Sequence, residues 1–503
     1  MKRKHTGLAV SVAAGTILAF ATGCNFTDEL LNVENPGAIT IEALNDPALL
    51  NVQVAGVIDA HQTAYSWNLE YTMYPTDEVI TGLNWEGYAR VNQRIISYLE
   101  GITDNTFERG SKALRMANDV AERIRVWAAD DPATWTVVGK TSPADFDPEL
   151  ATTLAFAGYS AIGLGETMCQ TVISPNPDDP SSTVLSQLET YAVALPYLNE
   201  ALTVALAAGE DDIANLARTG LARVYLGLGD WGNAVTFANQ VPTGFSWWMD
   251  YVDISGGRNP LQNTSHGGNF TLGIHPQFTG LHPSFDGTGF TFLDNDVIAP
   301  QTDPRIQHAT RDRTGHNSLT PLYKLFQGLR YSQYQGETLA PMSASCPNCT
   351  GVDEDDFEDY LLANRETDVL LADYTEAQHH LHEALAMQGG NDAAVLTFVN
   401  ARRAVGNQAP VTLSGQALIT ELRNQRARDL FMGGFRLPDL RRWTRFDAGN
   451  GPFASGSYFP TGIHANVQWG AYDVWTCFPI PLSEYEGNEN LSVPTNPDVP
   501  TGI

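Results

Sequence analysis

Residues 422–443 read LRNQRARDLFMGGFRLPDLRRW, and we take this stretch as the point around which the fold is organised. Its pattern predicts an amphipathic helix that stops at Gly433 and Gly434, followed by a short extended exit through Pro438. The apolar side chains expected to face the core are Ile419, Leu422, Leu430 and Phe431.

The arginines of this stretch stand out because the whole chain has a formal charge of −29. A half-buried guanidinium needs either an internal carboxylate or an anionic ligand. Glu421, Asp429 and Asp439 are interleaved with the arginines and suit bidentate pairing. We therefore expect a structural lock in which Arg436 and Arg441 pair with buried or neighbouring carboxylates.

The composition is that of a folded protein, with 43% hydrophobic and 17% charged residues among 503. The length allows two to four average domains or one large helical domain with insertions. The strong negative charge argues against nucleic acid as a partner, because the phosphate backbone would be repelled.

The N-terminus has the organisation of a signal peptide over residues 1–23: a basic start, an apolar run over 7–21, and small residues before Cys24. The apolar run is too short to span a membrane. Cys24 after small residues resembles a bacterial lipobox, although Ala21 stands where leucine is usual. We expect acylation of Cys24 and a lipid-anchored tether over residues 24–40; ordinary secretion is the alternative.

The body, residues 41–503, reads as mostly α-helical. One helix pair carries Ala222, Tyr225, Gly229, Trp231 and Ala234 at the small-large-turn-aromatic-small positions of a tetratricopeptide (TPR) unit. Similar helix pairs are expected over about 103–241 and 357–432. The helices are predicted at about 41–62, 88–129 with a break near 101–105, 150–171, 186–208, 213–228, 231–239, 357–388, 393–405 and 416–432.

Two loop-rich portions, about 65–87 and 244–351, are expected to hold the ligand, and the second should contain a few short strands. Aromatic side chains in exposed loops can stack on sugar rings or other flat apolar ligands. The candidate ligand-binding residues are Trp67, Trp85, Tyr88, Trp247, Trp248 and Tyr251.

Four cysteines remain after Cys24, and an exported chain can form disulfides. Cys346 and Cys349 lie in one polar loop and are predicted to form a local disulfide. Cys169 and Cys477 could pair with each other, but the sequence does not show that they meet.

The sequence contains no motif that commits the chain to catalysis, a cofactor or a metal. Residues 227–232 spell G-x-G-x-x-G, but no strand precedes them, so the dinucleotide-binding context fails. His379, His380 and His382 are read as a solvated helix face. Asp77 and Glu78 could in principle serve a glycosidase, but adjacency in sequence does not set the separation that such enzymes need.

Seven segments in order resemble the SusD/RagB family of outer-membrane nutrient-binding lipoproteins. They are Cys24–Asn32, Ala217–Ala234, Asp303-Pro304-Arg305, Asn364–Ala377, Asn400–Gly406, the stretch through Asp439-Leu440-Arg441-Arg442-Trp443, and Phe478–Pro481 continuing to Leu491. Gly433 stands where the family often has glutamate.

This resemblance implies a SusD-like fold of TPR-like helix pairs around a loop-rich ligand-binding portion. It also implies a cell-surface lipoprotein of the outer membrane that captures oligosaccharides or peptides for a SusC-like TonB-dependent transporter. The alternatives are a periplasmic TPR-type protein-binding scaffold and, less favoured, a glycan hydrolase.

Overall fold

The computed structural model describes residues 41–81, 86–173, 183–252 and 368–464, residues 470–494, and short pieces between 259 and 328. The chain divides into two units, residues 1–50 and 51–503. The first contributes α3 (Ile41–Leu44) and the short 3-10 helix η1 (Pro47–Leu49), whose N-cap Asp46 accepts a hydrogen bond from the Ala48 amide.

Helix α4 (Leu50–Met73) runs 11 residues beyond the predicted end at Gln62. The start of the predicted loop over 65–87 is therefore wrong. Trp67 and Tyr71 stand four residues apart, the spacing of one helix face, whereas Tyr65 lies on the opposite side of α4 and Tyr74 follows its end. β1 (Val79–Thr81) follows and pairs with β5 (Leu272–Ile274).

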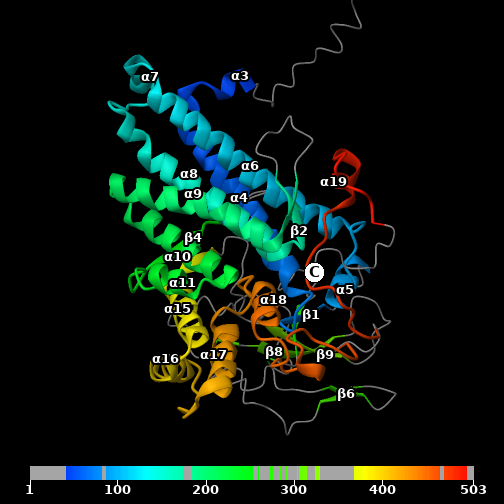
Figure 1. Ribbon diagram of the computed structural model, residues 1–503. Coiled ribbons are helices and arrows are strands. Elements are labelled where there is room, and N and C mark those ends of the chain that lie inside the picture. The colour runs from blue at the N-terminus through cyan, green and yellow to red at the C-terminus, as the bar shows by residue number, and fades with distance from the viewer. Residues whose placement is uncertain are drawn as a thin grey trace, which may run out of the picture. The chain divides into compact units, whose positions relative to one another are not determined.

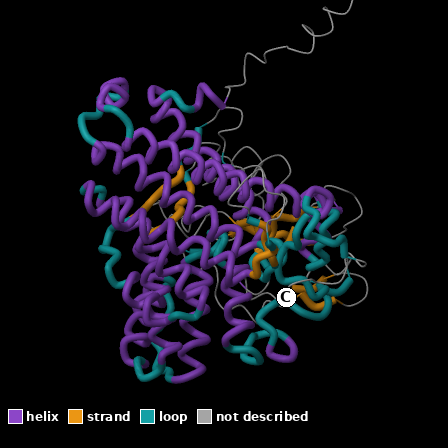
Figure 2. The backbone as a smooth tube through the Cα atoms, turned by 45° about the horizontal axis from the view of Figure 1, so that its top comes forward, coloured by secondary structure: helices purple, strands orange, loops and turns teal. Residues whose placement is uncertain are grey.

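Helices make up most of the described residues of the second unit, and the described strands are short (Figure 2). The break predicted near residue 101 falls earlier, between α5 (Glu86–Asn92) and α6 (Gly101–Ala129). The elements are α5 (Glu86–Asn92), α6 (Gly101–Ala129), α7 (Pro132–Val137), η2 (Pro143–Phe146), α8 (Asp147–Thr167), α9 (Gln187–Ala208), α10 (Asp211–Leu228) and α11 (Trp231–Ala238).

Consecutive helices of this series lie side by side: α6 contacts α8, α8 contacts α9, and α9 contacts α10 (Figure 1). Glycines allow the close approach. An added Cβ at Gly158 of α8 or Gly220 of α10 would meet the Leu198 side chain of α9 at 2.5 and 3.1 Å.

Among the described helices, α9 is the one long and apolar enough to cross a membrane. Its buried Leu198 instead packs between two neighbouring helices.

The α10–α11 pair has the local features predicted for a TPR-like unit. Gly229 adopts a left-handed conformation (φ 80°) at the end of α10. Asp230 caps α11 by accepting a hydrogen bond from the Asn233 amide. Ala222 and Ala234 are fully buried, so the two helices approach closely, and both also contact α15 (Tyr374–Gln388).

The second helical group is α15 (Tyr374–Gln388), α16 (Asp392–Val405), α17 (Gly415–Asp429) and α18 (Arg436–Phe446). The predicted helix over 357–388 is wrong at residues 369–373, which form β10 (Val369–Asp373) and pair with β4 (Ser246–Met249). Residues Val369 to Ala372 are buried on both faces, so their apolar pattern is as typical of a core strand as of a helix.

The remaining strand pairs among the described residues are β2 (Gln170–Val172) with β3 (Val184–Ser186), β6 (Pro283–Phe285) with β7 (Phe290–Phe292), and β8 (His308–Arg313) with β9 (Tyr323–Gly328).

The predicted extended exit after Gly434 is wrong, because α18 begins at Arg436 and contains Pro438. Proline is tolerated there since the first-turn amides of a helix have no intrahelical acceptor. Buried ion pairs between arginines of residues 422–443 and carboxylates are present, as predicted. Arg436 makes two hydrogen bonds of 2.6 Å to Asp77, and Arg426 makes one of 2.6 Å to Asp439.

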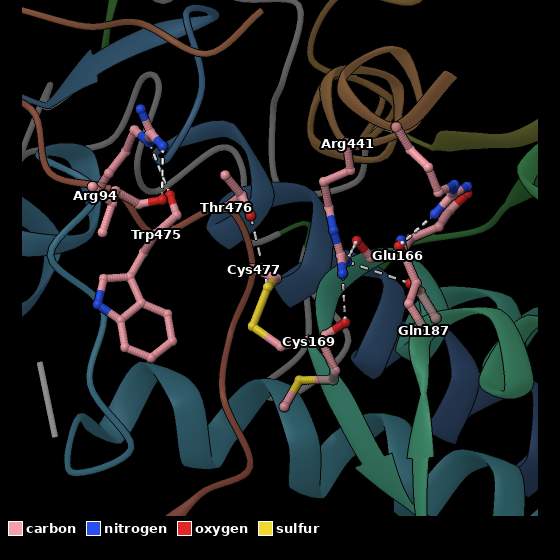
Figure 3. The surroundings of a disulfide bond; sticks show 12 residues. Arg94, Glu166, Cys169, Gln187, Arg441, Trp475, Thr476 and Cys477 are labelled. Carbon is pink, nitrogen blue, oxygen red and sulfur yellow. Dashed lines mark hydrogen bonds between the residues drawn. A yellow bond between two sulfur atoms is a disulfide. The ribbon is translucent and has the colours of Figure 1, made fainter. Parts of the chain in front are cut away.

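Arg441 does not pair with a carboxylate as predicted. Its guanidinium donates to the carbonyl oxygens of Glu166 (2.8 Å) and Met168 (3.0 Å) at the end of α8 (Figure 3). A cation at a helix C-terminus is favoured by the free carbonyls and by the helix dipole.

Beside Arg441, the disulfide Cys169–Cys477 joins the end of α8 to the C-terminal segment (Figure 3). The pairing that the sequence left open therefore exists. Backbone hydrogen bonds flank it: the Cys169 amide donates to Phe478 O (2.8 Å), and the Phe478 amide donates to Thr167 O (2.9 Å). The short helix η7 (Ala454–Gly456) precedes Cys477 in the chain, and α19 (Leu482–Gly487) follows it.

The prediction that the histidines of α15 form a solvated face is wrong for His379 and His380, whereas His382 is partly exposed. His379 and His380 are fully buried, and burial lowers the pKa of His379 to about 4. His379 bonds to Asp429 (2.7 Å) and His380 to Glu376 (2.9 Å). In both rings Nε2 bonds to a buried carboxylate, so these two side chains are part of the core.

Candidate functional site

A cluster of aromatic side chains lies where α4, α5 and α6 meet, and it contains two of the predicted ligand-binding residues. Trp67 and Tyr71 are one helical turn apart on α4, with ring centroids 5.3 Å apart. Tyr88 of α5 meets Tyr71 at 6.1 Å and Tyr74 at 5.2 Å in edge-to-face contacts. Trp67 and Tyr88 are partly exposed, whereas Tyr71 and Tyr74 are buried. We call these four residues, together with Glu70 and Arg109, the Trp67 cluster.

The cluster contains one acidic and one basic side chain. The Arg109 guanidinium of α6 lies 4.3 Å from the centroid of the Trp67 ring, within the range of a cation–π interaction. Glu70 lies on α4 between Trp67 and Tyr71 and is 2% exposed. Burial raises the pKa of Glu70 to about 8, against the opposing effects of hydrogen bonding by Tyr88 and the positive charge of Arg109. At neutral pH this carboxyl therefore keeps its proton.

This geometry suits binding of a ring-shaped ligand. Two partly exposed aromatic faces offer stacking surfaces, and each such contact contributes about 1 kcal/mol beyond area burial. An arginine and a protonated carboxyl next to them can donate hydrogen bonds to ligand oxygens. The sequence analysis does not identify Glu70 and Tyr71, because it predicts a loop over 65–87, or Arg109, because its contact with Trp67 depends on how α6 packs on α4. A helical reading of the aromatic spacing would have placed Glu70 and Tyr71 beside Trp67.

The other described candidates are not in the cluster: Trp247 and Trp248 lie on β4, and Tyr251 follows it by two residues. Trp247 packs edge-to-face on Phe156 of α8 at 6.1 Å, which is a core contact. Tyr251 is buried and its hydroxyl bonds to that of Ser66. Trp248 is partly exposed, and its indole N–H donates to the Ser246 hydroxyl (3.1 Å). The structure thus brings together Trp67 and Tyr88, but not these three residues. Trp85, Cys24, Cys346 and Cys349 lie outside the described residues.

The acidic pair considered for glycosidase chemistry is structural. Asp77 is 0% exposed and bonds to Arg436, while Glu78 is fully buried and accepts a hydrogen bond from the Met432 amide. Across the described ranges, no group of three or more His, Cys, Asp or Glu side chains is placed to hold a metal ion.

A cavity of about 30 Å³ among α4, α6, α8 and α10 is lined by His61, Asn68, Ser160 and Arg223, among others. It could hold one or two water molecules, but sugar-sized ligands need cavities of at least about 300 Å³. Ser160 Oγ donates its hydrogen to Phe156 O (2.8 Å), so His61 Nδ1, at 2.9 Å, must donate to Ser160. His61 Nε2 is then a bare acceptor, buried without a hydrogen-bond partner.

His61→Phe is expected to flatten the acid side of the pH–stability profile. Burial, followed by the charge of Arg223, lowers the pKa of His61 from 6.5 to about 3. The neutral His61 ring therefore contributes to the free energy of unfolding, and this contribution is fully present above pH 6.5. It is lost as pH falls towards 3, by up to about 1.4 kcal/mol per pH unit. Between pH 7.5 and 4.5 the wild type should lose about 2–3 kcal/mol more than the variant, measured by urea unfolding. Equal pH dependence of the two proteins would refute this assignment.

Comparison with known proteins shows the fold. No family model matches the sequence, and it has no significant match among the curated proteins. Solved structures do match. A SusD homolog from Bacteroides thetaiotaomicron VPI-5482 superposes with a TM-score of 0.61 at 15% identity, covering 89% of this chain and 96% of that one.

Two further structures match over similar lengths. A SusD-like carbohydrate-binding protein from Bacteroides fragilis NCTC 9343 gives a TM-score of 0.60 at 14% identity, covering 89% of this chain and 99% of that one. A laminarin-binding SusD-like protein gives 0.53 at 15% identity, covering 87% and 98%. The chain therefore has the SusD-like fold, mostly α-helical with small strand pairs, as predicted.

Proposed function

We propose that this protein belongs to the SusD/RagB family and binds oligosaccharides at the cell surface without converting them. The observation that carries the proposal is the SusD-like fold over about nine tenths of the chain, shared with structures described as carbohydrate-binding and laminarin-binding. The partly exposed aromatic faces of the Trp67 cluster support it, because they offer a stacking surface for sugar rings. Peptides are the alternative ligand.

Delivery to a SusC-like TonB-dependent transporter, and anchoring in the outer membrane through acylated Cys24, form the second part of the proposal. They rest on the family resemblance and on the signal-peptide and lipobox pattern of residues 1–24. The Cys169–Cys477 disulfide supports export, since disulfides persist in oxidising compartments. Acyl labelling of wild type and Cys24→Ser tests the anchor: equal labelling of the two proteins would count against it.

Trp67→Ala is expected to weaken oligosaccharide binding by about fivefold to tenfold, because one stacking surface of about 1 kcal/mol or more is lost. Binding of laminari-oligosaccharides and other neutral oligosaccharides to the mature protein would be measured by calorimetry. Trp231→Ala is a matched control: Trp231 is also partly exposed and packs on an aromatic ring, Phe446 at 5.0 Å, but lies on α11, away from the cluster. Unchanged affinity of Trp67→Ala would place the site elsewhere.

Two alternative functions give different results in simple assays. A periplasmic protein-binding scaffold would survive protease treatment of intact cells, whereas a surface protein would be cleaved. A glycan hydrolase would release product from the bound oligosaccharide, and such product would overturn the binding proposal.

A further inference from the structure

Arg109 differs from the other enclosed arginines of the fold. Arg223, Arg426 and Arg436 each form ion pairs with carboxylates at 2.6 Å. Arg94 and Arg441 donate to several backbone carbonyls instead.

Arg109 has neither kind of partner set. Within the described part of the chain, no carboxylate lies within 4.0 Å of its guanidinium, and its Nη1 is buried without a hydrogen-bond partner. A buried donor that lacks an acceptor costs about 1–3 kcal/mol, more when it is charged. The guanidinium lies 4.3 Å from the centroid of the Trp67 ring and interacts with the Tyr71 hydroxyl, so its position is fixed while its Nη1 has no acceptor.

The acidic group that could neutralise Arg109 does not do so at neutral pH. Glu70 is enclosed in the same cluster, and its Oε1 has no hydrogen-bond partner. Burial raises the pKa of Glu70 to about 8, so the carboxyl is protonated at neutral pH. The cluster then carries one net positive charge, a carboxyl group that can donate a hydrogen bond, and partly exposed faces on Trp67 and Tyr88.

We propose that the Trp67 cluster is a subsite for a uronic-acid residue of an acidic oligosaccharide, with the sugar ring on Trp67 or Tyr88 and its carboxylate on Arg109. This proposal rests on the proposed function and names its ligand class. A uronic acid combines a pyranose face with a carboxylate, so it would use both the aromatic surfaces and the guanidinium fork. A neutral sugar would use only the aromatic surfaces, and an acidic peptide would use chiefly the guanidinium.

The formal charge of −29 does not prevent this selectivity. It repels anions at long range, but charges separated by more than about 8 Å are largely screened at physiological salt. A guanidinium in direct, partly desolvated contact therefore decides the local preference.

The test uses the mature full-length protein and a panel of uronic-acid oligosaccharides, including oligogalacturonates and alginate fragments. Each is paired with its carboxyl-reduced form, which differs only in the carboxylate. Calorimetry should show binding of at least one acidic member about tenfold tighter or more than of its reduced form. Arg109→Gln should reduce the affinity for the acidic member to that for its reduced form, which removes the preference, and Arg109→Lys should keep part of it.

Arg115→Gln serves as a control on the same helix, because its side chain is 60% exposed and pairs with Asp119. It should leave both affinities unchanged. Equal affinity of the wild type for every acidic oligosaccharide and its reduced form would overturn the acidic subsite and leave carbohydrate binding intact. Tight binding of a triglutamate peptide with no binding of any acidic glycan would overturn it in favour of a peptide ligand. Failure to bind any oligosaccharide, acidic or neutral, would remove the proposed function as well.

Discussion

Replacing Arg436 by alanine is expected to lower the free energy of unfolding by about 3 kcal/mol or more, because it leaves the Asp77 carboxylate buried without its partner. Asp77 is 0% exposed, and both of its oxygens accept hydrogen bonds of 2.6 Å from Arg436. Arg436 also lies 5.4 Å from the Trp443 ring centroid, so the truncation removes packing as well as charge. Urea unfolding followed by tryptophan fluorescence measures the loss.

Arg115→Ala is the matched control for this prediction. It breaks an exposed ion pair with Asp119 at 3.8 Å, which should contribute less than about 1 kcal/mol. Replacing both buried partners, as in Asp77→Leu with Arg436→Met, should recover part of the stability that Arg436→Ala loses. A loss no larger than that of Arg115→Ala would contradict the structural role of residues 422–443. The oligosaccharide affinity of the folded fraction should stay unchanged, because Arg436 lies outside the Trp67 cluster.

The second large effect is expected from the disulfide. Cys169→Ser with Cys477→Ser should lower the free energy of unfolding by about 2–5 kcal/mol, since the bridge joins residues 308 positions apart and so restricts the unfolded chain. A reductant should bring the wild type to the stability of the variant in the same denaturation experiment.

Cys346→Ser with Cys349→Ser provides the comparison. If these two cysteines form the predicted local disulfide, it closes a loop of only four residues and should contribute less. Peptide mapping without reductant should detect the Cys169–Cys477 cross-link. Free thiols at both positions in the exported protein would contradict the structure.

The sequence predicted the helical architecture well where the local signals are strong. The helices α8 to α11 match their predicted ranges to within a few residues, because Gly209, Gly229 and the capping side chain of Asp230 mark their ends. The prediction failed where one local sequence pattern is compatible with two kinds of secondary structure. The apolar run before Tyr374 reads equally as a strand, and Pro438 is as compatible with a first helical turn as with an extended segment.

The candidate site was predicted only in part. Trp67 and Tyr88 were predicted from their residue type. Glu70 and Arg109 join them only because α4 packs against α6. His379 and His380 were misread for a related reason: their carboxylate partners come from Asp429 on a later helix and from the preceding turn of their own helix. Which polar groups pair inside a core is set by tertiary contacts that no local pattern contains.

Affinity purification of this protein from gently solubilised outer membranes tests the central proposal most directly. The account predicts recovery of a large β-barrel TonB-dependent transporter together with acylated protein. Recovery of the protein alone from the soluble periplasmic fraction, with no transporter bound, would contradict it.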